Sequence, residues 1–169
     1  SLQKICFFVR MARILLITLA NSICRMSLSR KTVKLLEVFI MSEKPILGIL
    51  LGNSAGVGPE LVAMLAVKDY YADYCRPVII GDLRMFEHGL KVVGGDVPHY
   101  VIDDLSQCDW SKGYPVLDLK DQDPSQVVYG EANAYCGAGD LKQLGTAIDL
   151  CKAGKIEGFV FGPLHKGAM

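Results

Sequence analysis

Short apolar runs alternate with amphipathic stretches from residue 46 onward. Residues 46–51 and 77–82 are apolar runs of strand length that end in turn residues, and residues 158–161 form a third such run. Weaker strand candidates occur at 100–102 and 116–119. Buried strands that alternate with helices predict an α/β fold, with a mostly parallel sheet flanked by helices and right-handed crossovers.

Three segments have the spacing expected of helices. Residues 61–67 follow the first strand, and residues 83–93 carry apolar positions at helical intervals before Gly94 and Gly95. The third helix is predicted to begin at Asp140 as its N-cap. Its predicted buried stripe consists of Leu141, Leu144, Ile148 and Cys151.

The connection between the first strand and the first helix is rich in glycine and reads G-N-S-A-G-V-G-P-E over residues 52–60. Pro59 suits the first helical position and Glu60 the first turn. A glycine-rich strand-to-helix turn directs N–H groups toward an anion at the helix start. The simpler interpretation is a tight connection without a ligand. The candidate substrate- or cofactor-binding residues are Gly52, Asn53, Gly56, Gly58, Pro59 and Glu60.

A second candidate segment, G-P-L-H-K-G-A-M, follows the strand at 158–161 and covers residues 162–169. Ligands of open α/β sheets gather at the carboxyl ends of strands. His165 and Lys166 are therefore the candidate catalytic residues, able to orient a substrate, carry a proton or hold a phosphate. The alternative is a solvated surface pair without a role.

Composition narrows the class of protein. The chain has 169 residues, 51% hydrophobic and 21% charged, which is typical of a globular protein. The first 40 residues hold seven basic residues and one acidic residue, which leaves the remainder with 11 and 17, a net charge of −6. A mildly acidic body argues against nucleic acid as a partner. Six cysteines without a C-x-x-C pair indicate reduced thiols and a cytoplasmic location.

Residues 1–40 differ from the rest of the chain and are predicted to lie outside the native fold, which leaves residues 41–169 as the structured part. Arg10 and Arg13 interrupt the apolar stretch, so no membrane span is predicted. A transit or signal peptide, upstream sequence before a natural start at Met41, and a helix packed on the body are the open interpretations. We favour the start at Met41.

The two loop segments resemble those of a known enzyme family. Residues 52–60 resemble the G-D-P-A-G-I-G-P-E segment of the 4-hydroxythreonine-4-phosphate dehydrogenases of vitamin B6 biosynthesis. Residues 162–166 resemble the family's T-[AG]-P-[ILV]-[NH]-K segment, with Phe161 at the threonine position. The resemblance covers 41–169, and two segments in matching order make chance agreement improbable.

The resemblance implies an isopropylmalate-dehydrogenase-like fold and a homodimer. It also implies NAD- or NADP-dependent oxidation of 4-phosphooxy-L-threonine, followed by loss of CO₂. In such enzymes a divalent metal (Zn, Mg or Co) polarises the alcohol oxygen, and basic residues hold the substrate phosphate.

Two departures qualify this expectation. Asn53 and Ser54 replace the aspartate and proline of the family segment, so one carboxylate is missing. The family's G-H-T-E segment and its three metal-binding histidines follow the point at which this sequence ends. We therefore expect a truncated, amino-terminal half of the fold that binds no catalytic metal and is inactive alone. His88 and His99 match no metal motif of the family and are predicted to be surface or structural residues.

Two further interpretations stay open. Paralogues of the B6 enzyme oxidise four-carbon sugar-acid phosphates such as threonate or erythronate 4-phosphate, and the changes at Asn53 and Phe161 make such a substrate the first alternative. The chain is alternatively a non-catalytic, truncated binding fragment.

Overall fold

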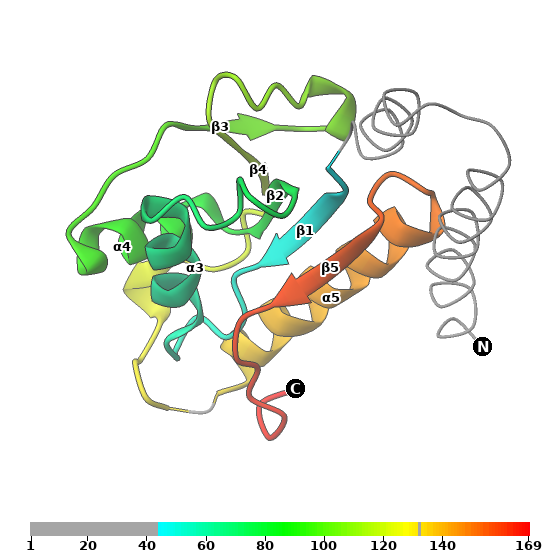
Figure 1. Cartoon of the computed structure of the whole chain (residues 1–169). Coiled ribbons are helices and arrows are strands. Elements are labelled where there is room, and N and C mark those ends of the chain that lie inside the picture. Colours follow the sequence, from blue (N-terminus) through cyan, green and yellow to red (C-terminus); the bar gives the residue numbers. More distant parts are fainter. Residues whose placement is uncertain (1–43, 132) are drawn as a thin grey trace, which may run out of the picture. The chain divides into compact units, whose positions relative to one another are not determined.

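Five parallel strands in the order β3-β4-β2-β1-β5 form the centre of the structure (Figure 1). Their bounds are Ile46–Leu50 for β1, Arg76–Gly81 for β2, His99–Ile102 for β3, Tyr114–Asp118 for β4 and Gly158–Phe161 for β5. The predicted α/β class with a parallel sheet is confirmed. All five predicted strands are present, and β4 begins two residues earlier than its sequence pattern indicates.

This computed structural model describes residues 44–131 and 133–169. The predictions for residues 1–40 and for a start at Met41 concern positions outside the described residues. No helix in the described part is long and apolar enough to cross a bilayer.

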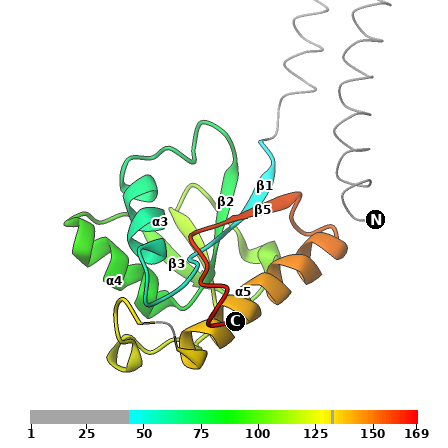
Figure 2. The same cartoon turned by 90° about the horizontal axis from the view of Figure 1, so that it is seen from below.

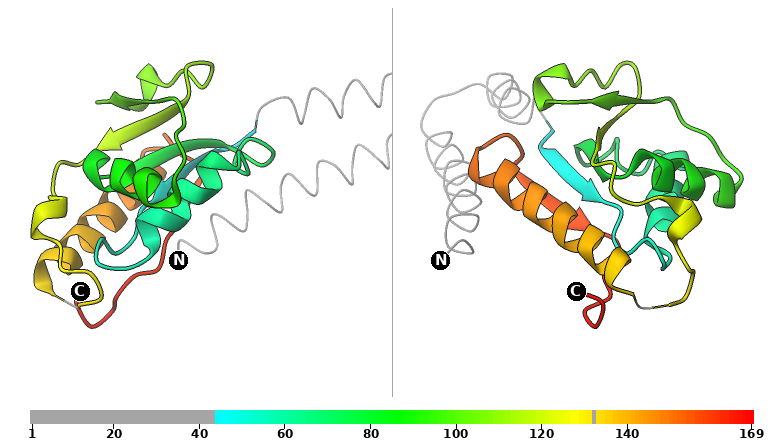
Figure 3. Two further views of the ribbon diagram at one scale, coloured as in Figure 1. Left: turned by 90° about the vertical axis from the view of Figure 1, so that its left-hand side faces the viewer. Right: turned by 180° about the vertical axis from the view of Figure 1, so that it is seen from behind.

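Three α-helices and two 3₁₀ turns connect the strands. Helix α3 spans Gly58–Val67, α4 spans Leu83–Val93 and α5 spans Ala134–Lys152; η1 is Leu105–Gln107 and η2 is Pro124–Gln126. Helices α3 and α4 pack together on one face of the sheet, whereas α5 crosses the other face over β1 and β5 (Figures 2 and 3). A sheet covered on both faces explains why its strands are apolar without alternation.

Each face of the sheet has its own hydrophobic core. Ile49, Ile79 and Val116 point toward α3 and α4, where they pack with Phe86 and Met85. The neighbouring positions point the other way because strand side chains alternate: Leu50, Val78 and Ile80 pack with Ala147 of α5. Since all these residues are almost fully buried, the two clusters hold the sheet between its helices.

The predicted start of the third helix was wrong. Helix α5 begins six residues before Asp140, and its N-cap is Asn133, whose side chain accepts a hydrogen bond from the Cys136 N–H. Gly137 and Gly139 made this stretch look like a turn. In the structure they lie in the first turns of the helix, and Gly137 lets the chain pass very close, since a Cβ there would lie 1.9 Å from the Ala168 carbonyl oxygen.

The predicted buried stripe of this helix was wrong in part. Leu144 and Cys151 pack against the second core, but Leu141 and Ile148 are exposed. The face that the sheet covers contains polar and small residues instead, namely Asp140, Gln143 and Ala147. The helix therefore buries side chains that make hydrogen bonds to the loop after β1.

The chain order reverses between β1 and β5. From β1 the chain passes through α3 to β2 on one side, whereas α5 carries it to β5 on the other side of β1. In open α/β sheets the carboxyl ends of strands at such a reversal flank a crevice that binds ligands. The loops after β1 and β5 are the two segments singled out in the sequence.

Candidate functional site

The loop after β1 and the segment after β5 lie against each other. The Asn53 N–H donates to the Pro163 carbonyl oxygen at 2.9 Å, and the Gly162 N–H donates to the Leu50 carbonyl oxygen at 3.0 Å. Gly58 and Gly162 allow the close approach, since a Cβ on Gly162 would lie 3.1 Å from the Gly58 Cα. Two segments that are a hundred residues apart in sequence thus form one surface at the carboxyl edge of the sheet.

The first half of the loop, at Gly52 and Asn53, is held from within. The Gly52 N–H donates to Gln143 Oε1 at 3.0 Å, and Gln143 Nε2 donates back to the Gly52 carbonyl oxygen at 3.2 Å. The N–H groups of Ala55 and Gly56 donate to the Asn53 side-chain and backbone oxygens at 3.0 and 3.1 Å. These N–H groups hold the loop in shape and are not directed at a ligand.

The second half of the loop faces solvent. Gly56 and Val57 are exposed, and no side chain caps the start of α3. Pro59 lies at the second helical position, one later than predicted, and Glu60 lies in the first turn as expected. The positive end of a helix dipole with uncapped N–H groups favours an anion, so this half is the part of the loop suited to a phosphate.

A buried amide–carboxyl pair lies under the loop. Asn53 Nδ2 donates to Asp140 Oδ2 at 2.8 Å, and Asp140 is 0% exposed. Burial raises the pKa of the Asp140 carboxyl, and the Asn53 hydrogen bond and nearby His165 oppose that rise only in part. The Asp140 Oδ1 atom has no hydrogen-bond partner among the described residues. Sequence reasoning missed this residue because it treated Asp140 as a helix cap.

His165 and Lys166 lie at the rim of the same surface. Both are exposed, and the His165 backbone N–H lies 3.5 Å from Asp140 Oδ2. A turn closes behind them, where the Ala168 N–H donates to the His165 carbonyl oxygen at 2.9 Å. The structure therefore brings the predicted catalytic pair beside the predicted binding loop, with both side chains accessible to a ligand.

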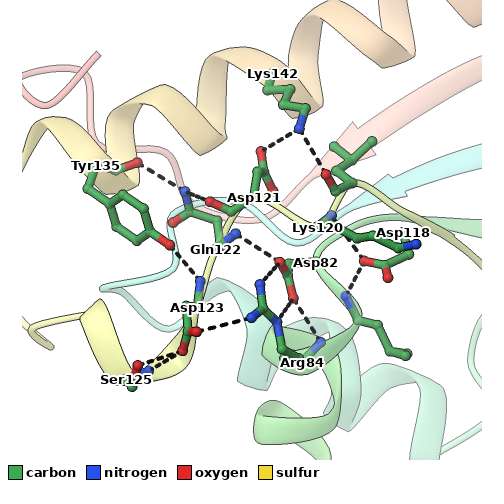
Figure 4. Close-up of polar contacts among 12 residues, drawn as sticks. Asp82, Arg84, Asp118, Lys120, Asp121, Gln122, Asp123, Ser125, Tyr135 and Lys142 are labelled. Atoms are coloured by element: carbon green, nitrogen blue, oxygen red, sulfur yellow. Dashed lines mark hydrogen bonds and ion pairs between the residues drawn. The ribbon is translucent and has the colours of Figure 1, made fainter.

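A second polar network occupies the carboxyl ends of β2 and β4 (Figure 4). Asp82 caps α4 by accepting from the Arg84 N–H at 3.0 Å, and its other oxygen accepts from the buried Gln122 N–H at 2.8 Å. The Arg84 guanidinium bridges Asp82 and Asp123 at 2.8 and 3.1 Å. Burial alone would raise the pKa of Asp82, but the hydrogen bonds from Arg84 and Gln122 outweigh it and lower that pKa.

Asp121, the next carboxyl group in this network, has a raised pKa, in contrast to Asp82. Asp121 has two buried side-chain oxygens without hydrogen-bond partners in the described structure, although Lys142 Nζ lies 3.7 Å from one of them. Burial raises the pKa of Asp121, and the charge of Asp82 adds to the effect. The network pins the turn after β4 to α4 and α5, and sequence reasoning treated this turn only as polar and irregular.

The described residues offer no ligand set for the divalent metal that the resemblance implies. Among residues 44–131 and 133–169, no three His, Cys, Asp or Glu side chains are grouped closely enough to hold an ion. His88 stacks on Tyr129 at 5.4 Å, and His99 lies 3.6 Å from Glu87 and edge-on to Phe86. Both histidines therefore contact neighbouring aromatic rings.

A hollow of about 310 Å³ lies at the opposite edge of the sheet. It surrounds the amino ends of β2 and β4, where Arg76 stacks over Trp110 at 5.1 Å and the Tyr114 hydroxyl bonds to Asp69 at 3.0 Å. The hollow shares no residue with the two loop segments, which lie at the carboxyl edge of the sheet.

Comparison with known proteins places the chain in a family. Residues 73–169 match the family model described as pyridoxal phosphate biosynthetic protein PdxA. A protein of Oceanobacillus iheyensis provisionally named D-threonate 4-phosphate dehydrogenase is 33% identical over 132 residues, 76% of this chain and 39% of its own length. The D-threonate 4-phosphate dehydrogenase of Bordetella bronchiseptica is 32% identical over 76% of this chain and 37% of its own.

The chain also resembles a solved structure of a protein with a related name. The crystal structure of a 4-hydroxythreonine-4-phosphate dehydrogenase from Burkholderia phymatum superposes with a TM-score of 0.69 at 30% identity, over 74% of this chain and 38% of that one. The chain spans less than two fifths of the length of these relatives.

Proposed function

Because the chain belongs to the pyridoxal phosphate biosynthetic protein PdxA family, we propose that it forms part of a dehydrogenase of a small phosphorylated hydroxy acid. One observation carries the proposal. The loop after β1 and the segment after β5, whose sequences resemble two segments of the family, are hydrogen-bonded to each other where the chain order reverses. The relatives that match the chain are named as dehydrogenases of such phosphates.

The proposed role of this surface is to hold and orient the phosphorylated substrate. Gly56 and Val57 present the uncapped start of α3 to an anion, and Lys166 adds a positive charge from the facing segment. Binding a remote phosphate fixes the position of the carbon that reacts. His165, exposed beside Lys166, is the candidate for moving a proton at the substrate hydroxyl.

The proposed hydride acceptor is NAD or NADP, which supplies the redox chemistry when bound. For the divalent metal that the family resemblance implies, the described residues provide no cluster of ligands. The homodimer and the cytoplasmic location remain predictions.

We propose 4-hydroxythreonine 4-phosphate as the substrate, with oxidation followed by decarboxylation in pyridoxal phosphate synthesis. D-Threonate 4-phosphate is the second candidate, because relatives with 32–33% identity carry that name. The two substrates differ in an amino group.

A spectrophotometric assay of NADH or NADPH formation tests the proposal. Both phosphates are offered to the 169-residue chain and to a protein in which the chain is continued to the length of its relatives. We expect turnover of one substrate by the longer protein and none by the 169-residue chain alone. Failure of the longer protein to oxidise either phosphate would support a non-catalytic binding fragment and contradict the proposal.

Lys166→Met gives a sharper test within the longer protein. Loss of a charged contact to phosphate costs about 1.5–3 kcal/mol, so kcat/KM should fall about 10- to 100-fold, mainly through KM. The control is Lys152→Met. Lys152 is an exposed lysine of α5 whose Nζ lies 3.9 Å from Asp149 Oδ1, a weak surface ion pair away from the two loop segments. Equal effects of the two substitutions would remove Lys166 from the site.

A further inference from the structure

We infer that Asp140 is a positioning residue of this site and supplies from helix α5 the carboxylate that the family segment carries at position 53. The inference rests on the proposed function. It concerns how the negative charge beside the binding loop is placed.

The orientation of the Asn53 amide is fixed by its neighbours. Its Oδ1 accepts from the Ala55 backbone N–H at 3.0 Å, and a backbone N–H can only donate. The Nδ2 group therefore points to Asp140 Oδ2, 2.8 Å away, and donates to it. Amide and carboxyl form a matched donor and acceptor with one negative charge between them.

An aspartate at position 53 is incompatible with this arrangement. Its first oxygen would still accept from Ala55, and its second would lie about 2.8 Å from Asp140 Oδ2, where Asn53 Nδ2 lies now. Two buried carboxylates at such a distance cannot both be ionised. Asn53 and Asp140 thus form a matched pair, in which the single carboxyl lies on the helix beneath the loop and not on the loop.

The same carboxyl oxygen ties the two motifs together. Asp140 Oδ2 accepts from Asn53 in the loop after β1 and lies 3.5 Å from the His165 N–H in the segment after β5. The ionisable groups that influence or face Asp140 are His165 and Cys136. The charge of Asp140 is buried under the loop and is not presented at its exposed half, at Gly56 and Val57.

A double-substitution cycle tests this pair without reference to activity. Asn53→Asp should lower the melting temperature by about 5–10 °C near pH 8, because the folded protein must keep a proton between the two carboxyls that the unfolded chain releases at this pH. The loss should largely disappear near pH 4, where one carboxyl binds a proton. Adding Asp140→Asn to Asn53→Asp should restore the melting temperature near pH 8, because donor and acceptor have changed places.

The control is Asp149→Asn, which removes the same charge from an exposed position of α5. Combined with Asn53→Asp, it should restore nothing. The inference is overturned if Asn53→Asp melts with the unmodified protein near pH 8, or if Asp140→Asn rescues it no better than Asp149→Asn. If Asn53→Asp does not fold near pH 8, its melting near pH 4 and the double variant still decide between these outcomes.

Kinetics of the longer protein then separate positioning from stability. Asn53→Asp should lower kcat/KM about tenfold near pH 8 and shift the pH profile of kcat/KM to lower pH, and the double variant should restore the profile. A profile that stays unchanged in Asn53→Asp would contradict the positioning role. Absence of turnover in the unmodified protein would instead refute the proposed function, and the melting cycle would still decide whether Asn53 and Asp140 form the matched pair.

Discussion

The buried carboxyl of Asp140 accepts a short hydrogen bond from Asn53, and its Oδ1 has no partner among the described residues. The free energy of unfolding should therefore depend on the ionisation of this carboxyl. Its pKa is raised in the folded state, so the folded form binds a proton more readily than the unfolded form. Its contribution to stability is therefore fully present below the unfolded pKa of about 3.9 and is lost as pH rises through the folded pKa.

Asp140→Asn should remove this dependence while keeping an acceptor for Asn53. We expect the variant to gain free energy of unfolding relative to the unmodified protein as pH rises from about 4 to 7. Urea unfolding at a series of pH values measures the difference in free energy of unfolding between the variant and the unmodified protein. Because Asp121 is present in both, its own pH dependence cancels in this difference. A constant difference over this range would mean that the folded pKa of Asp140 is not raised.

Two glycines of α5 make a matched pair for testing the packing of the C-terminal segment. A Cβ at Gly137 would collide with the Ala168 carbonyl, whereas a Cβ at Gly145 meets nothing within 4 Å. Gly145→Ala should stabilise the protein by about 0.5–1 kcal/mol through helix propensity. Gly137→Ala should instead destabilise it by about 1–3 kcal/mol, the usual cost of overpacking.

Free energies of unfolding in urea distinguish the two glycine substitutions. Equal stabilisation by both would show that residues 167–169 do not pack on the start of α5 in solution.

At the scale of elements, Asp82 connects α4 to the turn after β4, and α5 contacts the same turn. It caps α4, and its buried oxygen accepts from Gln122 in the turn after β4, which α5 also contacts through Tyr135 and Lys142 (Figure 4). Asp82→Ala should cost about 2–4 kcal/mol, since the cap is lost and the buried Gln122 N–H is left unpaired. Asn133→Ala, which removes a simple cap, should cost about 1 kcal/mol.

The Asp82 effect should depend on pH in the opposite sense to that of Asp140. Because the folded pKa of Asp82 is lowered, its contribution is present above about pH 4 and is lost as pH falls through the folded value. Unfolding measured from neutral to acidic pH should show the Asp82→Ala variant approaching the unmodified protein. A gap that does not narrow in acid would contradict the assigned ionisation of Asp82.

The sequence was most informative where an element follows one rule. Helix α4 matched its predicted range of 83–93 because its apolar spacing, the Asp82 cap and the left-handed Gly94 at its end all agree. Helix α5 was misjudged because its buried face is built from Asp140 and Gln143, which bond to the loop after β1. Periodicity of apolar residues cannot detect a helix face that is buried for its polar contacts.

For the candidate site, motif order was enough to name the two segments but not their internal contacts. The alternating pattern indicated a parallel sheet, but only the strand order, in which β5 lies beside β1, shows that 52–60 and 162–166 meet. That N–H groups of the first half of the loop are used internally depends on Gln143 and Pro163, which lie far away in sequence. Only the folded arrangement reveals such partners.

For the whole molecule, burial predicts which strands exchange their backbone amide hydrogens most slowly. Residues Val78, Ile79 and Ile80 of β2 are 0% exposed and have a strand on each side. β5 has a neighbour only on its β1 side among the described strands, and Val160 and Phe161 are 49% and 56% exposed. Amide exchange followed by mass spectrometry should be slowest in β2 and fastest in β5. Uniform protection across the sheet would contradict this order.

The pairing of β1 with β5 also bears on how the chain is made. β1 is the first described strand to leave the ribosome, and its outer flank stays open until β5 emerges, after the rest of the sheet and α5 have been synthesised. Until β5 emerges, the nascent chain thus carries an unpaired strand edge, the kind of surface that chaperones bind. The same pairing brings the segment after β5 to the loop after β1, so these two parts of the candidate site meet only after β5 has been made.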